Sequence, residues 1–235
     1  MTKIDTKIKS FKILPQPTDE SCGPTCLHAV YNYYDDETDI NRLLKEVKQI
    51  KGGGTLAVML ANHALTRGYK ATIYTYNLQM FDPTWFEGNT DISEKLTEQR
   101  QYKTSKRMQQ ATDAYLRFLS LGGQLKYEEL NPELLENYLM DNIPILTGLS
   151  ATYLYNSSRE IPKYNVYHDT KGEPTGHFVV LSGLTNHEVE IADPLNPTPI
   201  YNKQQYYKVP TRRVIHAILL GILTFDANLL ILQPK

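Results

Sequence analysis

The sequence predicts an α+β fold in which N-terminal helices pack on a later antiparallel β-sheet, with a helical insertion in between. Apolar residues recur at helical spacing through most of the first 66 of the 235 residues. Segments with the alternation of β-strands gather after residue 143. Between these parts, residues 80–127 become polar and charge-rich. We therefore expect a single domain over residues 1–235, with 80–127 as a helical insertion or lid within it.

Three helices are predicted in the N-terminal part. The first begins at Cys22, because Ser21 can cap it and apolar side chains then recur on one face. Thr38 or Asp39 can cap a second helix, whose apolar residues continue to residue 50. A third helix ends at Gly68, since glycine readily adopts the left-handed conformation that terminates helices.

The middle of the chain alternates between strands and helices. Lys70–Tyr76 has the alternation of a strand, and one long helix is predicted over Ile92–Leu121 inside the insertion. Asn131 can cap a short helix that leads to a strand at Ile143–Leu149. Residues 151–175 are rich in Tyr, Ser, Lys and Pro, so we expect a polar loop there.

The C-terminal part carries the clearest strands. Gly176–Leu184 is a strong strand, and Glu188–Asp193 alternates as its hairpin partner. A helix near Thr211–Leu220 and a final β segment through Leu232 complete the prediction.

Composition excludes several classes of function. The net charge is -1, so the chain lacks the excess positive charge that is typical of proteins that bind nucleic acid or an anionic membrane. The longest apolar run, Val214–Phe225, is too short to cross a bilayer, and Met1–Ser10 lacks the apolar core of a signal peptide. The 17 Tyr against 6 Phe indicate half-buried rings whose hydroxyls reach water or a partner.

The two cysteines, Cys22 and Cys26, are four residues apart on one predicted helix. That geometry is poor for a disulfide, so we expect two thiols and a reducing compartment, hence a cytoplasmic protein. Together with His28 they could suggest a metal, but the cluster lacks the second ligand pair that is typical of zinc sites. We expect no metal and no cofactor.

Four residues have the chemistry of a cysteine hydrolase: Gln16, Cys22, His177 and Asp193. Cys22 stands at a predicted helix N-terminus, where unpaired N–H groups favour a thiolate. His177 begins one strand of the predicted hairpin and Asp193 ends the other, so the carboxylate can orient the imidazole that takes the thiol proton. The Gln16 amide, just upstream, can join the Cys22 backbone N–H as an oxyanion hole.

The motifs around these residues resemble the C39 family of papain-like cysteine peptidases. Three runs carry the resemblance. Gln16–Leu27 ends in Cys-Gly-x-x-x-Leu, and Gly176–Leu181 contains His-Phe-Val-Val. Ile191–Pro194 contains Asp-Pro. The resemblance covers about residues 11–76 and 132–200. It implies a papain-like fold, a thiolate–imidazolium pair and cleavage of a peptide or related amide bond through a thioester, with a peptide or protein as substrate.

Many C39 peptidases form the N-terminal domain of bacteriocin exporters. This chain shows neither the membrane helices nor the ATPase of those exporters, so we expect a free-standing hydrolase. Two other readings stay open: a C39-like module that binds peptides without cutting them, and an acyl or peptidyl transferase that uses the same thiol. Asn196 is a second candidate for orienting the base, and His168 is the reserve candidate for the base itself.

Overall fold

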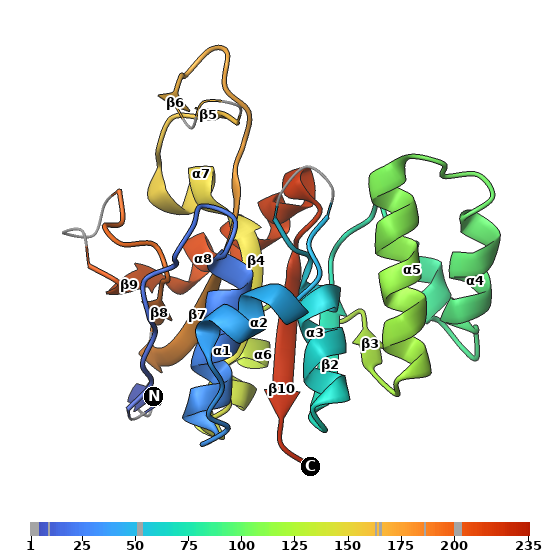
Figure 1. Ribbon diagram of the computed structural model, residues 1–235, viewed down its shortest axis with the longest axis horizontal. Coiled ribbons are helices and arrows are strands. Elements are labelled where there is room, and N and C mark those ends of the chain that lie inside the picture. The colour runs from blue at the N-terminus through green and yellow to red at the C-terminus, as the bar shows by residue number, and fades with distance from the viewer. Residues whose placement is uncertain are drawn as a thin grey trace.

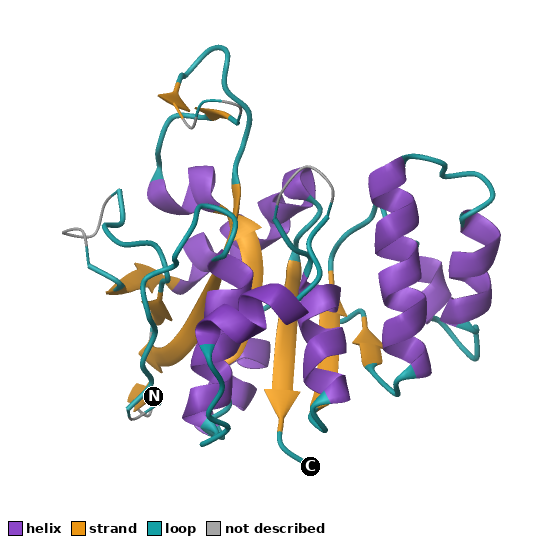
Figure 2. Ribbon diagram, in the orientation of Figure 1, coloured by secondary structure: helices purple, strands orange, loops and turns teal. Residues whose placement is uncertain are grey.

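The computed structural model describes residues 5–8, 10–50, 54–162, 164, 166–185, 187–199 and 204–235. Its main β-strands are β1 (Asp5–Lys7), β2 (Lys70–Thr75), β3 (Gln124–Lys126), β4 (Ile145–Ser150), β7 (Gly176–Thr185), β8 (Glu188–Ala192), β9 (Tyr206–Pro210) and β10 (Asn228–Gln233). They form one eight-stranded sheet in the order β3-β2-β10-β4-β7-β8-β9, with β1 beside β7 (Figure 2). The β2–β3 pair is parallel and the other pairs are antiparallel.

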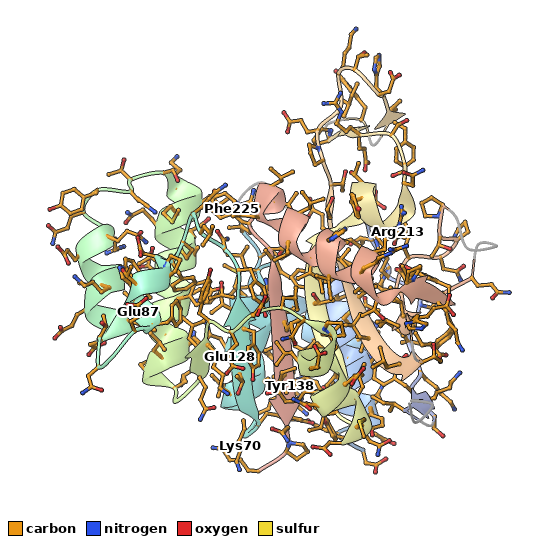
Figure 3. The ribbon with its side chains drawn as sticks, turned by 180° about the vertical axis from the view of Figure 1, so that it is seen from behind. Lys70, Glu87, Glu128, Tyr138, Arg213 and Phe225 are labelled. Atoms are coloured by element: carbon orange, nitrogen blue, oxygen red, sulfur yellow. The ribbon has the colours of Figure 1, made fainter. Side chains whose placement is uncertain are left out.

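Helices cover both faces of this sheet. They are α1 (Cys22–Tyr33), α2 (Ile40–Glu46), α3 (Ala57–Thr66), α4 (Ile92–Gln99), α5 (Lys106–Ser120), α6 (Pro132–Met140), α7 (Ala151–Tyr155) and α8 (Thr211–Leu220). In Figure 1, α1 and α3 lie in front of the strands, and the view from behind in Figure 3 shows α6 and α8 on the opposite face. The predicted α+β class, with N-terminal helices on an antiparallel sheet, is confirmed.

The predicted long helix over Ile92–Leu121 is wrong, because the segment forms two helices, α4 and α5. Ser105 begins the second helix by accepting a hydrogen bond from the Met108 N–H (3.3 Å). A side chain that bonds its own backbone in this way favours a new cap over a continuing helix. Gln109 donates to the carbonyls of Arg100 (2.9 Å) and Lys103 (2.7 Å) and so closes the turn between the two helices.

The expected polar loop at 151–175 contains regular structure. Ser150 caps α7 by accepting from the Tyr153 N–H (3.3 Å). The strands β5 (Glu160–Ile161) and β6 (Val166–Tyr167) then pair in a protruding arm that rises from the body of the molecule (Figure 1). The strand β9 was also not predicted from the sequence.

The segment 80–127 lies beyond β2, at one end of the sheet (Figure 1). Its helix α5 packs on α3, and β3 extends the sheet beside β2. Inside the segment, the rings of Phe81 and Tyr115 meet edge to face at 4.8 Å, and Phe118 and Leu96 are fully buried. Among the residues that the structure describes, no helix is long and apolar enough to cross a membrane.

Candidate active site

The N-terminal end of α1 carries Cys22. Ser21 precedes it and was expected to cap the helix, but its hydroxyl donates to the Thr18 carbonyl (2.7 Å) and accepts from the Thr18 N–H (2.9 Å). Ser21 therefore fixes the turn before the helix, because its oxygen is committed to Thr18 and does not cap the first-turn N–H groups. These N–H groups and the helix dipole favour negative charge at the Cys22 sulfur.

Gly23 brings the start of α1 close to its neighbours. A Cβ at this position would stand 2.5 Å from Cγ2 of Thr55 and 3.3 Å from the ring of Phe178. A larger residue would therefore displace Thr55, which precedes α3, and would press on Phe178 of β7. The glycine allows the start of α1 to pack closely against both neighbours.

The histidine and the aspartate meet across the β7–β8 hairpin. Pairing of Val180 with Ala192 brings the start of β7 beside the end of β8, which Asp193 directly follows. His177 Nε2 lies 2.8 Å from Asp193 Oδ1. Only 7% of His177 is exposed and Asp193 is fully buried, so their interaction is little screened by solvent.

Asp193 accepts hydrogen bonds on both carboxylate oxygens. In addition to His177, the Leu195 N–H donates to Oδ1 (2.8 Å). The Tyr155 hydroxyl (2.6 Å) and the Tyr207 hydroxyl (2.5 Å) donate to Oδ2. Four donors satisfy a charge that would otherwise be costly to bury.

Tyr155 and Tyr207 were missed by the sequence analysis. Tyr155 lies on α7, inside the stretch expected to be a loop, and Tyr207 lies on β9, which was not predicted. The only sequence signal was the high tyrosine count, which predicts hydroxyls with partners but does not identify the partners.

The electrostatics favour a charged histidine. Burial alone would lower the pKa of the His177 imidazole, but the charge of Asp193, the hydrogen bond to it and a side-chain hydrogen bond with Cys22 raise that pKa to about 10. Burial would raise the pKa of the Asp193 carboxyl, yet His177 and the two tyrosine hydroxyls lower it. Since Nε2 is bound to Asp193, Nδ1 is the ring nitrogen left for Cys22.

Gln16 is tied to the same region. Its backbone N–H donates to the Pro194 carbonyl (2.8 Å), so the turn before α1 is joined to the residue that follows Asp193. Its side-chain Nε2 donates to the Thr18 carbonyl (3.1 Å). Its Oε1 is buried and has no hydrogen-bond partner among the residues that the structure describes.

The alternative residues lie elsewhere. The His168 ring is on the arm, where its Nδ1 accepts from the Thr170 and Lys171 N–H groups. Asn196 is exposed. Cys26 is buried in the core and its thiol donates to the Phe178 carbonyl (3.3 Å). Within the described ranges, no group of three or more potential ligand side chains is placed to hold a metal ion.

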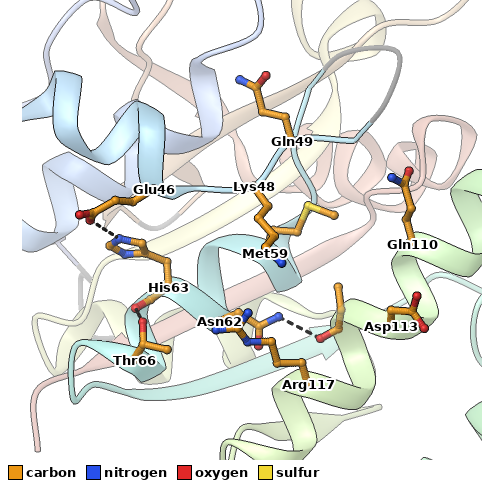
Figure 4. Close-up of a pocket in the computed structure, with 11 residues that line it drawn as sticks. Glu46, Lys48, Gln49, Met59, Asn62, His63, Thr66, Gln110, Asp113 and Arg117 are labelled. Atoms are coloured by element: carbon orange, nitrogen blue, oxygen red, sulfur yellow. Dashed lines mark hydrogen bonds and ion pairs between the residues drawn. The ribbon is translucent and has the colours of Figure 1, made fainter.

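A separate cavity of about 310 Å³ lies between α2, α3 and α5 (Figure 4). His63 forms part of its wall and contacts Glu46 (3.1 Å) and the Tyr31 hydroxyl (2.9 Å). Asn62 donates from Nδ2 to the Ala114 carbonyl (2.9 Å), which joins α3 to the insertion. None of the four residues predicted for catalysis lines this cavity.

The fold, with a cysteine at the start of its first helix, is that of the papain-like cysteine peptidases. A sequence model of the Peptidase_C39 like family matches residues 8–215, and the chain belongs to this family. A comparison with curated protein sequences found no significant match.

Solved structures also resemble the chain. One is assigned as a C39-like peptidase from Bacillus anthracis, with 14% identity, coverage of 98% of both chains and a TM-score of 0.50, and it supports the shared fold. Another is the peptidase domain of Streptococcus ComA, a bi-functional ABC transporter, with 17% identity, coverage of 96% of this chain and 99% of that one, and a TM-score of 0.45. A third is a double glycine motif protease from an AMS/PCAT transporter in complex with the leader peptide, with 14% identity, coverage of 99% of both and a TM-score of 0.46.

Proposed function

We propose that this protein is a thiol hydrolase that cleaves a peptide or related amide bond, with Cys22 as nucleophile, His177 as base and Asp193 as the group that orients His177. The observation that carries this proposal is the buried His177–Asp193 hydrogen bond of 2.8 Å, with Cys22 near enough to the same imidazole to raise its pKa. Membership of the C39-like family supports a peptide as the substrate class.

The first half of the reaction forms a thioester. The Cys22 thiol gives its proton to Nδ1 of His177, and the thiolate attacks the carbonyl carbon of the substrate. The Cys22 N–H and the Gln16 amide are proposed to donate to the oxygen that becomes negative. When this intermediate collapses, His177 returns the proton to the leaving amine and the C–N bond breaks.

The second half releases the acid. Water gives a proton to His177 and attacks the thioester, and the thiol of Cys22 is restored when the C–S bond breaks and the proton returns to sulfur. Asp193 stays ionised throughout and stabilises the imidazolium that forms in each half, as expected for an orienting carboxylate. An amine in place of water would make the same enzyme a transferase.

The test is a peptide-library digestion analysed by mass spectrometry, with and without added amines. Wild type should release peptide acids, and Cys22→Ala should release none. Cys26→Ala is the matched control, because it removes a thiol from the same helix and should keep its turnover. Cleavage by Cys22→Ala at the wild-type rate would contradict the thiol mechanism, and amide products in the amine arm would assign a transferase.

A further inference from the structure

The carboxylate of Asp193 is held from two separate segments of the chain. Its Oδ2 accepts from the Tyr155 hydroxyl (2.6 Å) of α7 and from the Tyr207 hydroxyl (2.5 Å) of β9. Its other oxygen, Oδ1, contacts the imidazole of His177. Two donors on Oδ2 limit the rotation of the carboxylate and so fix the direction in which Oδ1 faces the imidazole.

The two ends of α7 are supported differently. Its first turn is fixed to the residue before β7, because the Ala151 N–H donates to the Thr175 carbonyl (2.8 Å) and the Thr152 hydroxyl accepts from the Thr175 N–H (3.0 Å). Tyr155 stands at the other end, where Asn156, with φ 53°, turns the chain into the arm. A helix of five residues has little stability of its own, so the end with Tyr155 needs support from outside.

That support comes from Arg213, in the first turn of α8 (Figure 3). Its Nη2 donates to the Tyr153 carbonyl (2.8 Å) and its Nε donates to the Leu154 carbonyl (3.0 Å). The guanidinium also lies over the Tyr153 ring, 5.4 Å from its centroid. Carbonyls at the C-terminal end of a helix lack partners within the helix and favour a cation. Arg213 therefore binds the end of α7 up to the residue directly before Tyr155.

Arg213 thereby joins the two segments that hold the carboxylate. The strand β9 runs directly into α8, since Pro210 ends the strand and Thr211 begins the helix. The segment that carries Tyr207 therefore also carries Arg213, which reaches across to α7. The two segments are linked twice, once through their hydroxyls at the carboxylate and once through the guanidinium at the helix end. A closed ring of contacts of this kind limits their motion relative to each other.

We propose that Arg213 is a positioning residue for the catalytic pair. By holding the end of α7 on α8, it keeps the Tyr155 hydroxyl bonded to Asp193. That carboxylate in turn keeps the His177 imidazole in the orientation in which it takes the proton of Cys22. The inference deepens the proposed function and rests on it.

Burial of the Tyr155 ring is not enough to place its hydroxyl. Tyr155 is only 3% exposed, and its ring lies beside the His177 imidazole, with centroids 6.2 Å apart. Packing keeps a ring in place, but a hydrogen bond also needs its two oxygens within about 3 Å of each other and well aligned. A small shift of the end of α7 would break the bond to Asp193 and leave the ring buried. Variants of Arg213 produce this shift.

The experiment compares Arg213→Met, Arg213→Lys and Arg212→Met in the full chain. Methionine keeps an apolar stem and removes both donors, whereas lysine keeps the charge and one donor group. Arg212→Met is the matched control, because Arg212 is the neighbouring residue on α8, is exposed, and loses the same charge. Circular dichroism establishes that each variant is folded at the temperature of the assay.

The first measurement is proton NMR of the hydrogen that His177 Nε2 shares with Asp193. A proton in a short hydrogen bond between an imidazolium and a carboxylate resonates far downfield of the amide protons, and its loss in His177→Ala assigns it. Arg212→Met should show the wild-type signal. Arg213→Met should broaden the signal or move it upfield, and Arg213→Lys should lie between the two.

The second measurement is steady-state kinetics on a cleaved peptide. We expect Arg213→Met to lower kcat about three- to tenfold and to leave KM within about twofold, because the change affects the orientation of the base and not the binding of the substrate. Arg213→Lys should recover part of the loss. In a Tyr155→Phe background, Arg213→Met should cause no further loss, since Arg213 is proposed to act through that hydroxyl.

A wild-type NMR signal in folded Arg213→Met would overturn the inference, and so would a loss of kcat that adds to that of Tyr155→Phe. If Arg213→Met does not fold, Arg213→Lys decides: a wild-type signal and kcat overturn the inference, and a partial loss that disappears in the Tyr155→Phe background supports it. Normal cleavage without any dependence on Arg213 removes the inference alone. An altered signal in Arg213→Met, with no peptide cleaved by wild type, removes hydrolysis as the function and leaves the positioning of the His177–Asp193 pair intact.

Discussion

At the scale of single residues, the two thiols of α1 lie in different surroundings. Cys22 is partly exposed at the helix start, whereas Cys26 is buried one turn later and bonded to the Phe178 carbonyl. Burial, with the nearby charges of Cys22 and Asp193, raises the pKa of the Cys26 thiol well above its usual value. The same helix therefore leaves one cysteine accessible and shields the other.

We expect brief iodoacetamide treatment of the folded protein near pH 6 to label Cys22 and to leave Cys26 unmodified. Only the thiolate reacts, and burial keeps Cys26 protonated and inaccessible. Peptide mapping by mass spectrometry gives the two sites separately, and urea-unfolded protein, labelled at both, is the control. Labelling at Cys22 should fall sharply in His177→Ala. Faster labelling of Cys26 would refute Cys22 as the nucleophile.

The donors to Asp193 give a second prediction at this scale. Tyr155→Phe and Tyr207→Phe each remove one hydrogen bond to a fully buried carboxylate, so each should lower the free energy of unfolding by about 1–3 kcal/mol. Tyr153→Phe, on the same helix as Tyr155 but partly exposed, should change it far less. Urea denaturation at pH 7 measures all three. Equal losses of unfolding free energy in the three variants would mean that the buried hydrogen bonds to Asp193 stabilise the fold no more than the exposed Tyr153 hydroxyl does.

Gln16 tests the oxyanion proposal. Removing one donor that acts only in the transition state should lower kcat by roughly 10²–10³ with little change in KM. Steady-state kinetics of Gln16→Ala on a cleaved peptide give both constants. A change in KM alone would show that Gln16 contacts the ground-state substrate and does not donate to the oxyanion.

At the scale of elements, two hydrogen bonds join α5 to the body, in addition to the packing of α5 on α3 and the pairing of β3 with β2. Asn62 on α3 donates to the Ala114 carbonyl of α5, and Arg107 donates to the Thr224 carbonyl. We propose that 80–127 flanks the substrate site around Cys22 and acts on substrate selection. Its helices are built around their own aromatic contacts, so loss of these two bonds should loosen the docking of α5 without unfolding it.

We therefore expect Asn62→Ala to increase proteolytic cleavage within 80–127, while the melting temperature of the body falls by only a few degrees, as for a loss of about 1 kcal/mol. Limited trypsin digestion followed by mass spectrometry measures the first effect, and Arg117→Gln serves as a surface control on α5. If cleavage in Asn62→Ala equals that in wild type, this bond does not hold the insertion.

At the scale of the whole molecule, three buried groups couple stability to pH. The pKa of His177 is raised to about 10 in the folded protein, so its contribution is complete below about 6.5 and is lost as the pH rises toward 10. The pKa of Asp193 is lowered, so its contribution is present above about 3.8 and is lost in acid. The pKa of Asp226 is raised to about 7, so its protonated form stabilises the fold and this is lost between about pH 4 and 7.

The expected outcome is a stability maximum in acidic solution, near pH 4, followed by a decline as the pH rises. Asp226→Asn should flatten the decline in the free energy of unfolding between pH 4 and 7. The decline above pH 7, which comes from His177, should remain. Urea unfolding followed by circular dichroism at one-unit pH steps measures both. A maximum above pH 8 would contradict the directions of these pKa shifts.

Local patterns in the sequence predicted most of the elements. Apolar periodicity placed α1, α2, β7 and β8, and the Asn131 cap placed α6 through its bond to the Leu134 N–H. The hairpin pairing that brings His177 beside Asp193 follows from two strands joined by a short turn, so that part of the candidate site was also predictable. These features depend on residues that are close in sequence.

Other features were decided only by the tertiary structure. The final strand β10 lies between β2 and β4, in the middle of the sheet, and this strand order is set by which apolar faces meet in the folded core. The bonds of Tyr155 and Tyr207 to Asp193, and the packing of Asp226 beside Gly176, join residues 38, 14 and 50 positions apart in the chain. No local pattern encodes such contacts, because the burial that gives a carboxyl its pKa and its partners exists only after distant segments have packed together.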